Sequence, residues 1–250
     1  MKYALIDADS IAYQACLTSK DNDEEGFERS EEVVVDKITT SIRWILDELN
    51  ENGVDVDFYK LFIGGYGNFR KIIYPEYKAN RTAPKPILLG FALDYMRNEL
   101  EAFSSNYLEA DDLVLGCKQH LENEDWTNEI VVCFIDKDLM QTEGTFFDYY
   151  FKRDVRLVTV SKEQAVQNLW LSMLTGDKAD NIITKKGIGI KTAEKILKRQ
   201  TTHFGAMRVC YAKYLEWFGR AAKMKFIINY RLLRMVTSDV PIPKSYTANF

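Results

Sequence analysis

Short apolar runs alternate with amphipathic segments along the first two thirds of the chain. Five of these runs predict strands, at residues 3–6, 58–63, 130–135, 145–149 and 156–160. The run at 130–135 is almost entirely apolar, which is typical of a parallel strand covered on both faces. Segments with helical periodicity predict helices at 30–50, 85–103, 110–121 and 163–174. Strands alternating with helices in this way indicate an α/β protein with a mainly parallel sheet flanked by helices.

Local signals mark where two of these helices begin. Ser30 precedes two glutamates and is a preferred N-cap. Ser161 and Gln164 have the spacing of a capping box. After Gly176 the pattern becomes helical, without repeats or a low-complexity linker, and we expect the last ten residues to be a disordered end rather than a docking peptide. We interpret the acidic stretch 21–36 as a solvated loop followed by a helix start.

Length and composition limit the classes of protein that the chain could represent. Its 250 residues, 46% of them hydrophobic, suffice for one large domain, alone or with a small appendage. No apolar run reaches the ~18 residues of a membrane-spanning helix, so we expect no membrane association. The chain reaches Asp7 too early for a signal peptide. The four cysteines lack paired spacing, which favours reduced thiols in the cytoplasm over disulfides or a zinc site.

Charge is distributed unevenly along the chain. The net charge is −4, yet the region from Lys185 to Arg234 holds 13 Lys or Arg and 2 Glu. That region therefore carries +11, and the remainder carries −15. A basic region beside an acidic body suits a polyanionic substrate, although solvated helix faces produce the same imbalance.

Acidic residues recur in four short clusters, each where an apolar segment ends or a helix begins. They are Asp7 with Asp9, Glu109 with Asp111 and Asp112, Asp136 with Asp138, and Asp177 with Asp180. Each cluster alone could be a helix cap or a strand-end turn. At the carboxyl ends of strands in an open α/β sheet, however, such clusters can converge where ligands bind. Converging carboxylates repel one another and select hard cations such as Mg²⁺ or Mn²⁺, which assist phosphodiester cleavage.

Two further motifs carry cations that suit a phosphate backbone. The sequence Gly-Ile-Gly-Ile-Lys-Thr-Ala at 187–193 allows a tight turn before a helix, whose free N–H groups can face a phosphate. The surrounding lysines are Lys185, Lys186, Lys191 and Lys195. The sequence Tyr-Lys-Ala-Asn-Arg at 77–81 places Lys78 and Arg81 on one side, with Tyr77 available for base stacking. The plainer readings are a helix connection and an exposed basic turn.

In combination and in this order, the motifs resemble those of a known family. Residues 3 to about 200 are similar to the 5′-nuclease superfamily of flap endonucleases and 5′–3′ exonucleases, especially its compact bacteriophage members. The resemblance implies a PIN-like α/β core at 1–165, with a helical arch near 77–106. It also implies a helical DNA-binding region at 166–250, with a helix–three-turn–helix element whose hairpin lies at 185–198.

The resemblance also implies roles for individual residues. The implied metal ligands, for two or more Mg²⁺ or Mn²⁺ ions, are Asp7, Glu109, Asp111, Asp112, Asp136, Asp138, Asp177 and Asp180. Asp111 and Asp136 are implied to lie closest to the chemistry, and Lys78 and Arg81 to contact the attacked phosphate. The implied DNA contacts are Tyr77, Lys78, Arg81, Lys185, Lys186, Gly187, Gly189, Lys191, Thr192 and Lys195, with a K⁺ ion at the 187–192 hairpin.

The expected partner is branched or 5′-ended duplex DNA, or an RNA–DNA hybrid. We expect the protein to act as a monomer in the cytoplasm, which is the host's cytoplasm if the chain is phage-encoded. One departure from the family pattern concerns the segment after the second strand, where the family has an aspartate. Here that segment contains Gly64 and Gly65. This absence supports an alternative, a structure-specific DNA-binding relative without cleavage. A third reading, a haloacid-dehalogenase-type phosphatase, rests only on Asp7 and Asp9, and Ile11 stands where that type has threonine.

Overall fold

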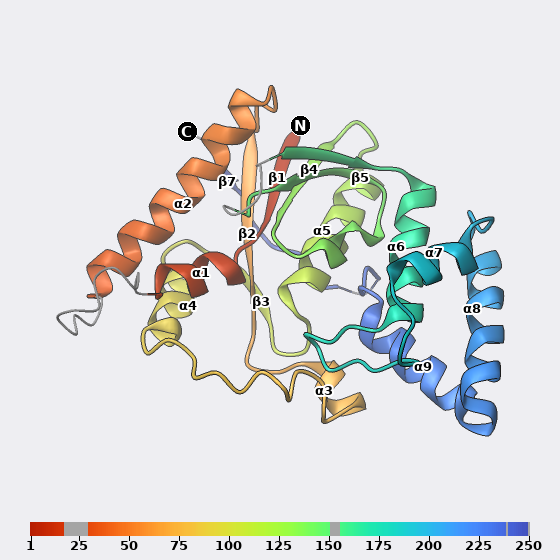
Figure 1. Cartoon of the computed structure of the whole chain (residues 1–250). Coiled ribbons are helices and arrows are strands. Elements are labelled where there is room, and N and C mark those ends of the chain that lie inside the picture. The colour runs from red at the N-terminus through yellow and green to blue at the C-terminus, as the bar shows by residue number, and fades with distance from the viewer. Residues whose placement is uncertain (18–29, 151–155, 239, 250) are drawn as a thin grey trace.

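A mostly parallel sheet forms the centre of the protein (Figure 1). The computed structural model describes residues 1–17, 30–150, 156–238 and 240–249. Within these ranges the sheet has seven strands: β1 (Lys2–Asp7), β2 (Phe58–Gly64), β3 (Phe103–Ser105), β4 (Glu129–Phe134), β5 (Gly144–Asp148), β6 (Arg156–Val160) and β7 (Thr247–Ala248). The five strands predicted from apolar runs are all present.

The strand order places a topological switch at the middle of the sheet. The order is β3-β2-β1-β4-β5-β6, and β7 pairs with β2. Strand β1 is parallel to both β2 and β4, with Leu5 opposite Lys60 and Val132. The chain therefore proceeds from β1 in one direction through β2 and β3, and later in the other direction through β4 and β5. Only β6 and β7 run antiparallel to their neighbours among the described strands, which confirms a mainly parallel sheet.

Alternation along the strands gives the sheet two apolar faces. One face packs on α1 (Asp9–Ala15), α2 (Glu31–Glu51) and α4 (Leu89–Asn98), through strand residues that include Ile6 and Ile63. The other face packs on α5 (Ala110–Glu124), through strand residues that include Leu5, Phe62 and Val132. Both faces are covered, as the apolar strand at 130–135 predicted.

A helical region with a core of its own adjoins the sheet. It comprises α6 (Lys162–Thr175), α7 (Ile190–Leu197), α8 (His203–Phe218), the 3-10 turn η3 (Gly219–Ala221) and α9 (Ala222–Leu233). Trp170 and Tyr214 are fully buried within it. The helical pattern expected after Gly176 does not form over 177–186, because an antiparallel bridge between Asp177 and Ile182 shapes a loop there, whereas the turn expected before a helix near 190 is present.

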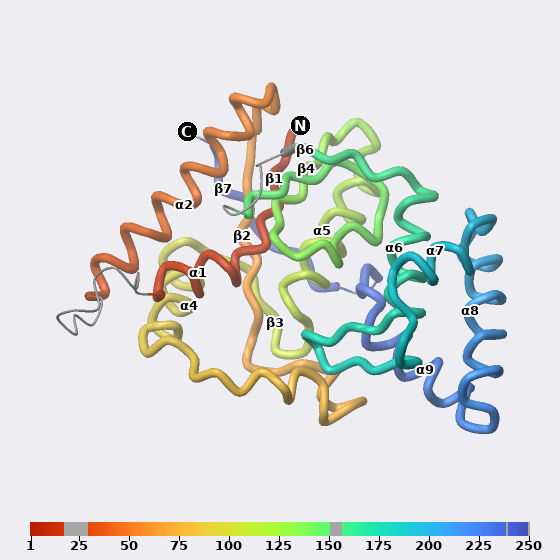
Figure 2. Tube along the Cα trace, in the orientation of Figure 1, coloured from red at the N-terminus to blue at the C-terminus, as the bar shows by residue number. Residues whose placement is uncertain are grey.

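The helix predicted at 85–103 forms only over α4 (Leu89–Asn98). Pro84 and Pro86 lie before it, and proline disfavours helix at the preceding residue. At its other end, Glu101 adopts a positive φ of 52°, which interrupts a helix. Only this part of the expected arch is therefore helical, and Ala92 and Met96 bury it against the core. Residues 74–88 run between α3 (Phe69–Ile73) and α4 without a helix (Figure 2).

The expectation of a disordered C-terminal end is wrong for the described residues. Val240 packs on Gly116, whose missing side chain makes room for it. The Tyr246 ring packs edge-on against Tyr3 at 5.2 Å, and β7 adds to the edge of β2. The last residues thus return to the α/β core, which modifies the expected boundary between a core at 1–165 and a separate region at 166–250.

Several local predictions are confirmed. Ser30 accepts a hydrogen bond from the N–H of Val33, and both bonds of the capping box at Ser161 and Gln164 are present. Of the acidic stretch 21–36, residues 21–29 lie outside the described residues and 31–36 begin α2. All four cysteines are buried free thiols. Within the described helices, none combines the length and apolarity that crossing a bilayer demands.

Candidate active site

The acidic clusters meet at the carboxyl ends of the central strands. Asp7 ends β1, Asp136 follows β4, and β1 and β4 flank the switch in strand order. Asp111 lies in the first turn of α5, which packs beside these strand ends. In open α/β sheets this edge is where ligands bind. The fold therefore brings together acids that are more than a hundred residues apart in the sequence.

Burial and the charges of neighbouring acids raise the pKa of Asp7 and of Asp111. Burial, then the charges of Asp9 and Asp136, raises the pKa of Asp7 to about 7. Burial, followed by Asp7 and Asp136, raises the pKa of Asp111 well above its ordinary value. Loss of hydration also raises the pKa of Asp9, whereas the hydrogen bond from the Gly64 N–H, followed by Lys78 and Lys85, opposes this shift. The pKa values of Asp7, Asp9 and Asp111 therefore all depend on the charges of neighbouring carboxylates.

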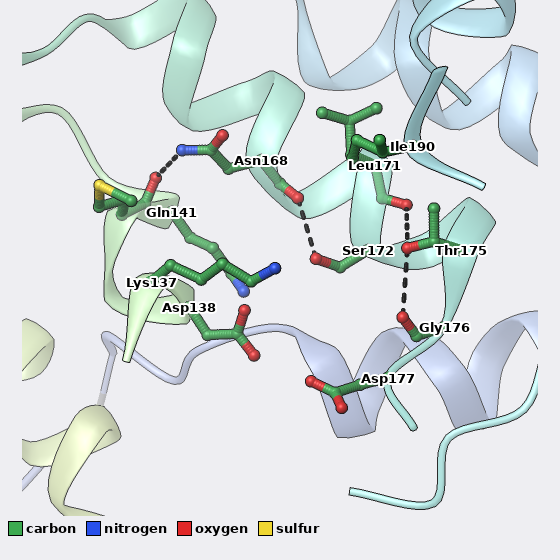
Figure 3. A pocket seen from close by; sticks show the side chains of 11 residues that line it. Lys137, Asp138, Gln141, Asn168, Leu171, Ser172, Thr175, Gly176, Asp177 and Ile190 are labelled. Carbon is green, nitrogen blue, oxygen red and sulfur yellow. Dashed lines mark hydrogen bonds between the residues drawn. The ribbon is translucent and has the colours of Figure 1, made fainter. Parts of the chain in front are cut away.

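A second part of the acidic group lies toward the helical region. Asp138 lies in the first turn of the 3-10 helix η2 (Lys137–Gln141), and burial followed by Asp136 and Asp177 raises its pKa to about 7. Asp138 and Asp177 line a cavity of about 150 Å³ between η2 and α6. Figure 3 shows their carboxylates turned toward one another, with polar side chains of α6 further along the wall.

These acids share one electrostatic neighbourhood without forming a ready-made cage. Within the ranges that the structure describes, no three His, Cys, Asp or Glu side chains converge closely enough to hold a metal ion. The donor set nevertheless fits a hard divalent cation, because it consists of carboxylates whose charges raise one another's pKa. An ion bound here requires side-chain rotations that bring its ligands together.

Lys78 and Arg81 are held by acids on either side. The Lys78 ammonium forms a short ion pair with Glu109 and lies 3.6 Å from Asp180. The Arg81 guanidinium pairs with Asp180, and its side chain is the more exposed of the two. The carboxylates of Glu109 and then Asp180 raise the pKa of Lys78 despite its burial. Both cations thus lie beside Glu109 and Asp180, and their predicted contact with a phosphate stays a prediction.

The prediction that Tyr77 is available for base stacking is wrong. Its side chain is only 3% exposed and belongs to the core of the helical region. Its hydroxyl lies 2.9 Å from a Glu109 oxygen and 2.8 Å from an Asp180 oxygen. Tyr77 therefore bridges two acids and positions them, and it has no ring face free for a base.

Backbone contacts join the segment 77–81 to the segment 177–181. The Lys78 N–H donates to the Asp180 carbonyl at 3.0 Å, and the Asn80 side chain donates to the Lys178 carbonyl at 2.7 Å. Lys78 adopts a positive φ of 58°, which is uncommon for a residue with a Cβ. Such conformations persist where the surrounding structure imposes them, often at functional sites.

Asp112 does not point into the acidic group. Its side chain is fully buried and accepts two hydrogen bonds from Arg70, at 2.6 and 2.8 Å. One of its oxygens also accepts the N–H of Val236 at 2.8 Å, and the other accepts that of Glu109 at 3.3 Å. The geometry therefore contradicts the prediction of Asp112 as a metal ligand. Adjacent residues of α5 face different ways, and Asp111 alone turns toward the cluster.

Asp9 occupies the space at the end of β2 where a carboxylate seemed to be missing. Its Oδ1 accepts the N–H of Gly64 at 2.7 Å, and a Cβ on Gly64 would lie 3.0 Å from its Oδ2. Gly65 has no room for a side chain, because a Cβ there would lie 1.9 Å from the Ser105 carbonyl oxygen. The predicted ligand set omitted Asp9, although its i, i+2 spacing from Asp7 was the available signal.

The predicted hairpin forms an exposed basic turn. Gly187 has a positive φ of 90°, and α7 begins at Ile190 with Gly189 as an N-cap that provides no side-chain hydrogen bond. All the lysines predicted to contact DNA here are exposed, as is Thr192: Lys185, Lys186, Lys191 and Lys195. An uncapped helix N-terminus among lysines favours an anion.

Comparison with known proteins places this arrangement in a family. Residues 2–170 match the family described as 5′-3′ exonuclease, N-terminal resolvase-like domain. DNA polymerase I of Caldicellulosiruptor bescii is 28% identical over 223 residues, which are 81% of this chain and 25% of the polymerase. A 5′-3′ exonuclease of Buchnera aphidicola is 27% identical over 206 residues, 78% of this chain and 69% of that protein. The chain thus spans about a quarter of the polymerase.

Solved structures share the fold. The bacteriophage T5 D15 protein co-crystallised with metal ions superposes with a TM-score of 0.68 at 16% identity, covering 95% of this chain and 90% of that one. A T5 D15 flap endonuclease complex with DNA and metal ions gives a TM-score of 0.64 at 17% identity and the same coverage. This likeness shows that the chain shares their fold, a mostly parallel sheet flanked by helices with a helical region beside it. The chain belongs to the 5′-3′ exonuclease family, through its N-terminal resolvase-like domain.

Proposed function

We propose that the chain is a divalent-metal-dependent 5′-nuclease that hydrolyses phosphodiester bonds in DNA. The observation that carries this proposal is the group of acids Asp7, Asp111 and Asp136, which lie together at the switch point between β1 and β4. Family membership and the metal-bound T5 relative support it. Exonuclease, flap endonuclease and RNase H activities are all compatible with such a group.

The proposed metal ligands are the acids that the fold gathers at the carboxyl ends of β1 and β4 and in the turns beside them. The central ligands are Asp7, Asp111, Asp136 and Asp138, and Glu109, Asp177 and Asp180 lie at the edge of the group. Compared with the set expected from the sequence, Asp9 is added and Asp112 is left out. Mg²⁺ or Mn²⁺ ions, two or more in number, suit an all-oxygen donor set. When bound, such ions lower the pKa of a coordinated water and stabilise charge on the phosphate.

Lys78 and Arg81 are proposed to bind the attacked phosphate. In the described geometry they pair with Glu109 and Asp180, so a phosphate competes with these carboxylates for the same cations. Cations placed beforehand beside developing charge stabilise a transition state more than mobile ones. The fixed backbone around Lys78 supports this role.

The exposed basic hairpin is proposed to hold duplex DNA away from the cut. Its lysines and the N-terminus of α7 suit backbone phosphates without regard to base sequence. The glycine turn at 187–192 could also hold K⁺ through carbonyl oxygens. The proposed substrate is branched or 5′-ended duplex DNA or an RNA–DNA hybrid, bound by a monomer in the cytoplasm, the host's if the chain is phage-encoded.

A binding relative without cleavage is the second candidate. The observation that favours it is the pair Gly64 and Gly65, which have no side chain where the family pattern has an aspartate. In that case the protein would bind branched DNA tightly and release no product with either ion.

The test uses 5′-labelled flap, nicked-duplex and RNA–DNA substrates with Mg²⁺, Mn²⁺ or EDTA. Metal-dependent release of short 5′ products is expected, and Asp138→Ala should abolish it while DNA affinity is preserved. Lys191→Ala should weaken duplex binding and reduce its salt dependence by about one phosphate contact. Cleavage by Asp138→Ala at the wild-type rate would refute the metal assignment, and binding without products would favour the second candidate.

A further inference from the structure

Two tyrosines stand exposed on the loops that border the acidic group. Tyr66 follows β2 and is 87% exposed, and Tyr107 follows β3 and is 66% exposed. Tyr66 lies two residues after Gly64, which binds Asp9 through its N–H. Tyr107 lies two residues before Glu109, which pairs with Lys78. Both rings are therefore carried by the chain segments that also hold residues of the site.

The two loops are locked against each other by their backbones. Gly65 and Gly67 approach so closely that a Cβ on either would lie about 2 Å from the carbonyl oxygen of Ser105 or Asn106. The Phe69 N–H donates to the Tyr107 carbonyl at 3.0 Å. Because the two loops are packed this closely, the backbone positions of Tyr66 and Tyr107 are well defined, although their rings are exposed.

The Tyr66 ring also has a cation against it. The Arg97 guanidinium carbon lies 5.5 Å from the ring centroid, within the range of a cation–π contact. Asp94 holds Arg97 in place at 2.6 Å. Most of the ring nevertheless remains open to solvent. An aromatic ring beside an arginine suits a nucleobase, which stacks on aromatic rings and carries its own phosphate.

We propose that Tyr66 and Tyr107 form a stacking surface for unpaired bases of the substrate strand next to the acidic group. This inference rests on the proposed function and assigns the role that buried Tyr77 is unable to play. Stacking does not depend on base identity, which suits a nuclease that follows strand ends rather than a sequence. Loss of one stacked base should lower affinity by about 5- to 140-fold.

The test compares normal and abasic DNA. Affinity is measured in EDTA, without cleavage, for a duplex with a short unpaired 5′ strand and for the same duplex with abasic unpaired positions. Tyr66→Ala and Tyr107→Ala should weaken binding of the normal substrate and change binding of the abasic one little. Tyr66→Phe should retain affinity, because it keeps the ring. Trp126→Ala is the matched control, since Trp126 is 88% exposed beside the amino end of β4.

The outcomes separate this inference from the function on which it rests. An equal loss on normal and abasic DNA, or no loss on either, would overturn the stacking surface while leaving DNA binding intact. If the wild-type protein binds neither substrate, the proposed function itself fails and the stacking surface with it. Because both rings are exposed, the alanine variants should melt at the wild-type temperature, and a lowered Tm would assign the rings a packing role instead.

Discussion

Replacing Asp112 by alanine should destabilise the protein regardless of metal. Asp112 is the charge partner of Arg70, whose fully buried guanidinium also donates to the Leu232 and Arg234 carbonyls at the end of α9. These bonds join the start of α5 to the segment that returns to the core, and the carboxylate of Asp112 keeps the pKa of Arg70 raised in spite of burial. In the variant, Arg70 keeps only Glu109, at 3.1 Å, as an anionic partner.

The magnitude follows from the burial of both partners. Both side chains have no exposed surface, so solvent does little to replace the lost pair. Breaking a buried pair by removing one partner costs about 3–5 kcal/mol. At about 2–4 °C per kcal/mol for a chain of this size, Tm should fall by roughly 6–20 °C. Asp94→Ala is the control, because its pair with Arg97 is half-exposed and should contribute about 1 kcal/mol or less.

The assay is thermal unfolding of both variants in EDTA and in excess Mg²⁺. A structural Asp112 predicts the same loss in both solutions and an unchanged stabilisation by Mg²⁺. A metal-binding Asp112 predicts the opposite: little loss in EDTA, where a repelling charge is removed, and no stabilisation by Mg²⁺. That second pattern would refute the reasoning. A double variant, Arg70→Met with Asp112→Leu, should recover much of the stability, since apolar replacement of a buried pair is often neutral.

Two further predictions concern the acidic group. Burial raises the pKa values of Asp7 and Asp138 from 3.8 to about 7, so between about pH 4 and 7 the folded state binds more protons than the unfolded state. Without divalent cations, Tm should therefore fall as pH rises from 4 to 7. The double variant Asp7→Asn with Asp138→Asn should show a weaker dependence of Tm on pH. A wild-type Tm that rises over this window would contradict the raised pKa values. Asp9→Asn keeps an acceptor for the Gly64 N–H but loses the charge, so it should fold normally and bind Mn²⁺ about tenfold more weakly in calorimetry. Unchanged Mn²⁺ affinity would mean that Asp9 has only a structural role, the hydrogen bond that joins α1 to the end of β2.

Local signals in the sequence were enough to place the strands and the main acids. An apolar run ending in Asp7 or Asp136 puts a carboxylate at a strand end wherever the strand lies in the sheet. The caps at Ser30 and Ser161 depend only on residues within one helical turn. A mainly parallel sheet then brings the strand ends to one edge, which is why the acids were predicted to converge.

The tertiary structure alone decided which neighbours each side chain meets. Asp111 and Asp112 are adjacent in sequence, yet only Asp112 meets Arg70, which lies 42 residues away. Tyr77 is buried because it contacts Asp180, more than a hundred residues later, and the C-terminal residues are ordered because they reach β2 and α5. Periodicity and capping record interactions within a few residues, whereas these partners are selected by packing between segments that the sequence pattern leaves unrelated. The fold was therefore predictable from local physics, whereas long-range contacts decided that Asp111 faces the acidic group and that Asp112 is paired with Arg70.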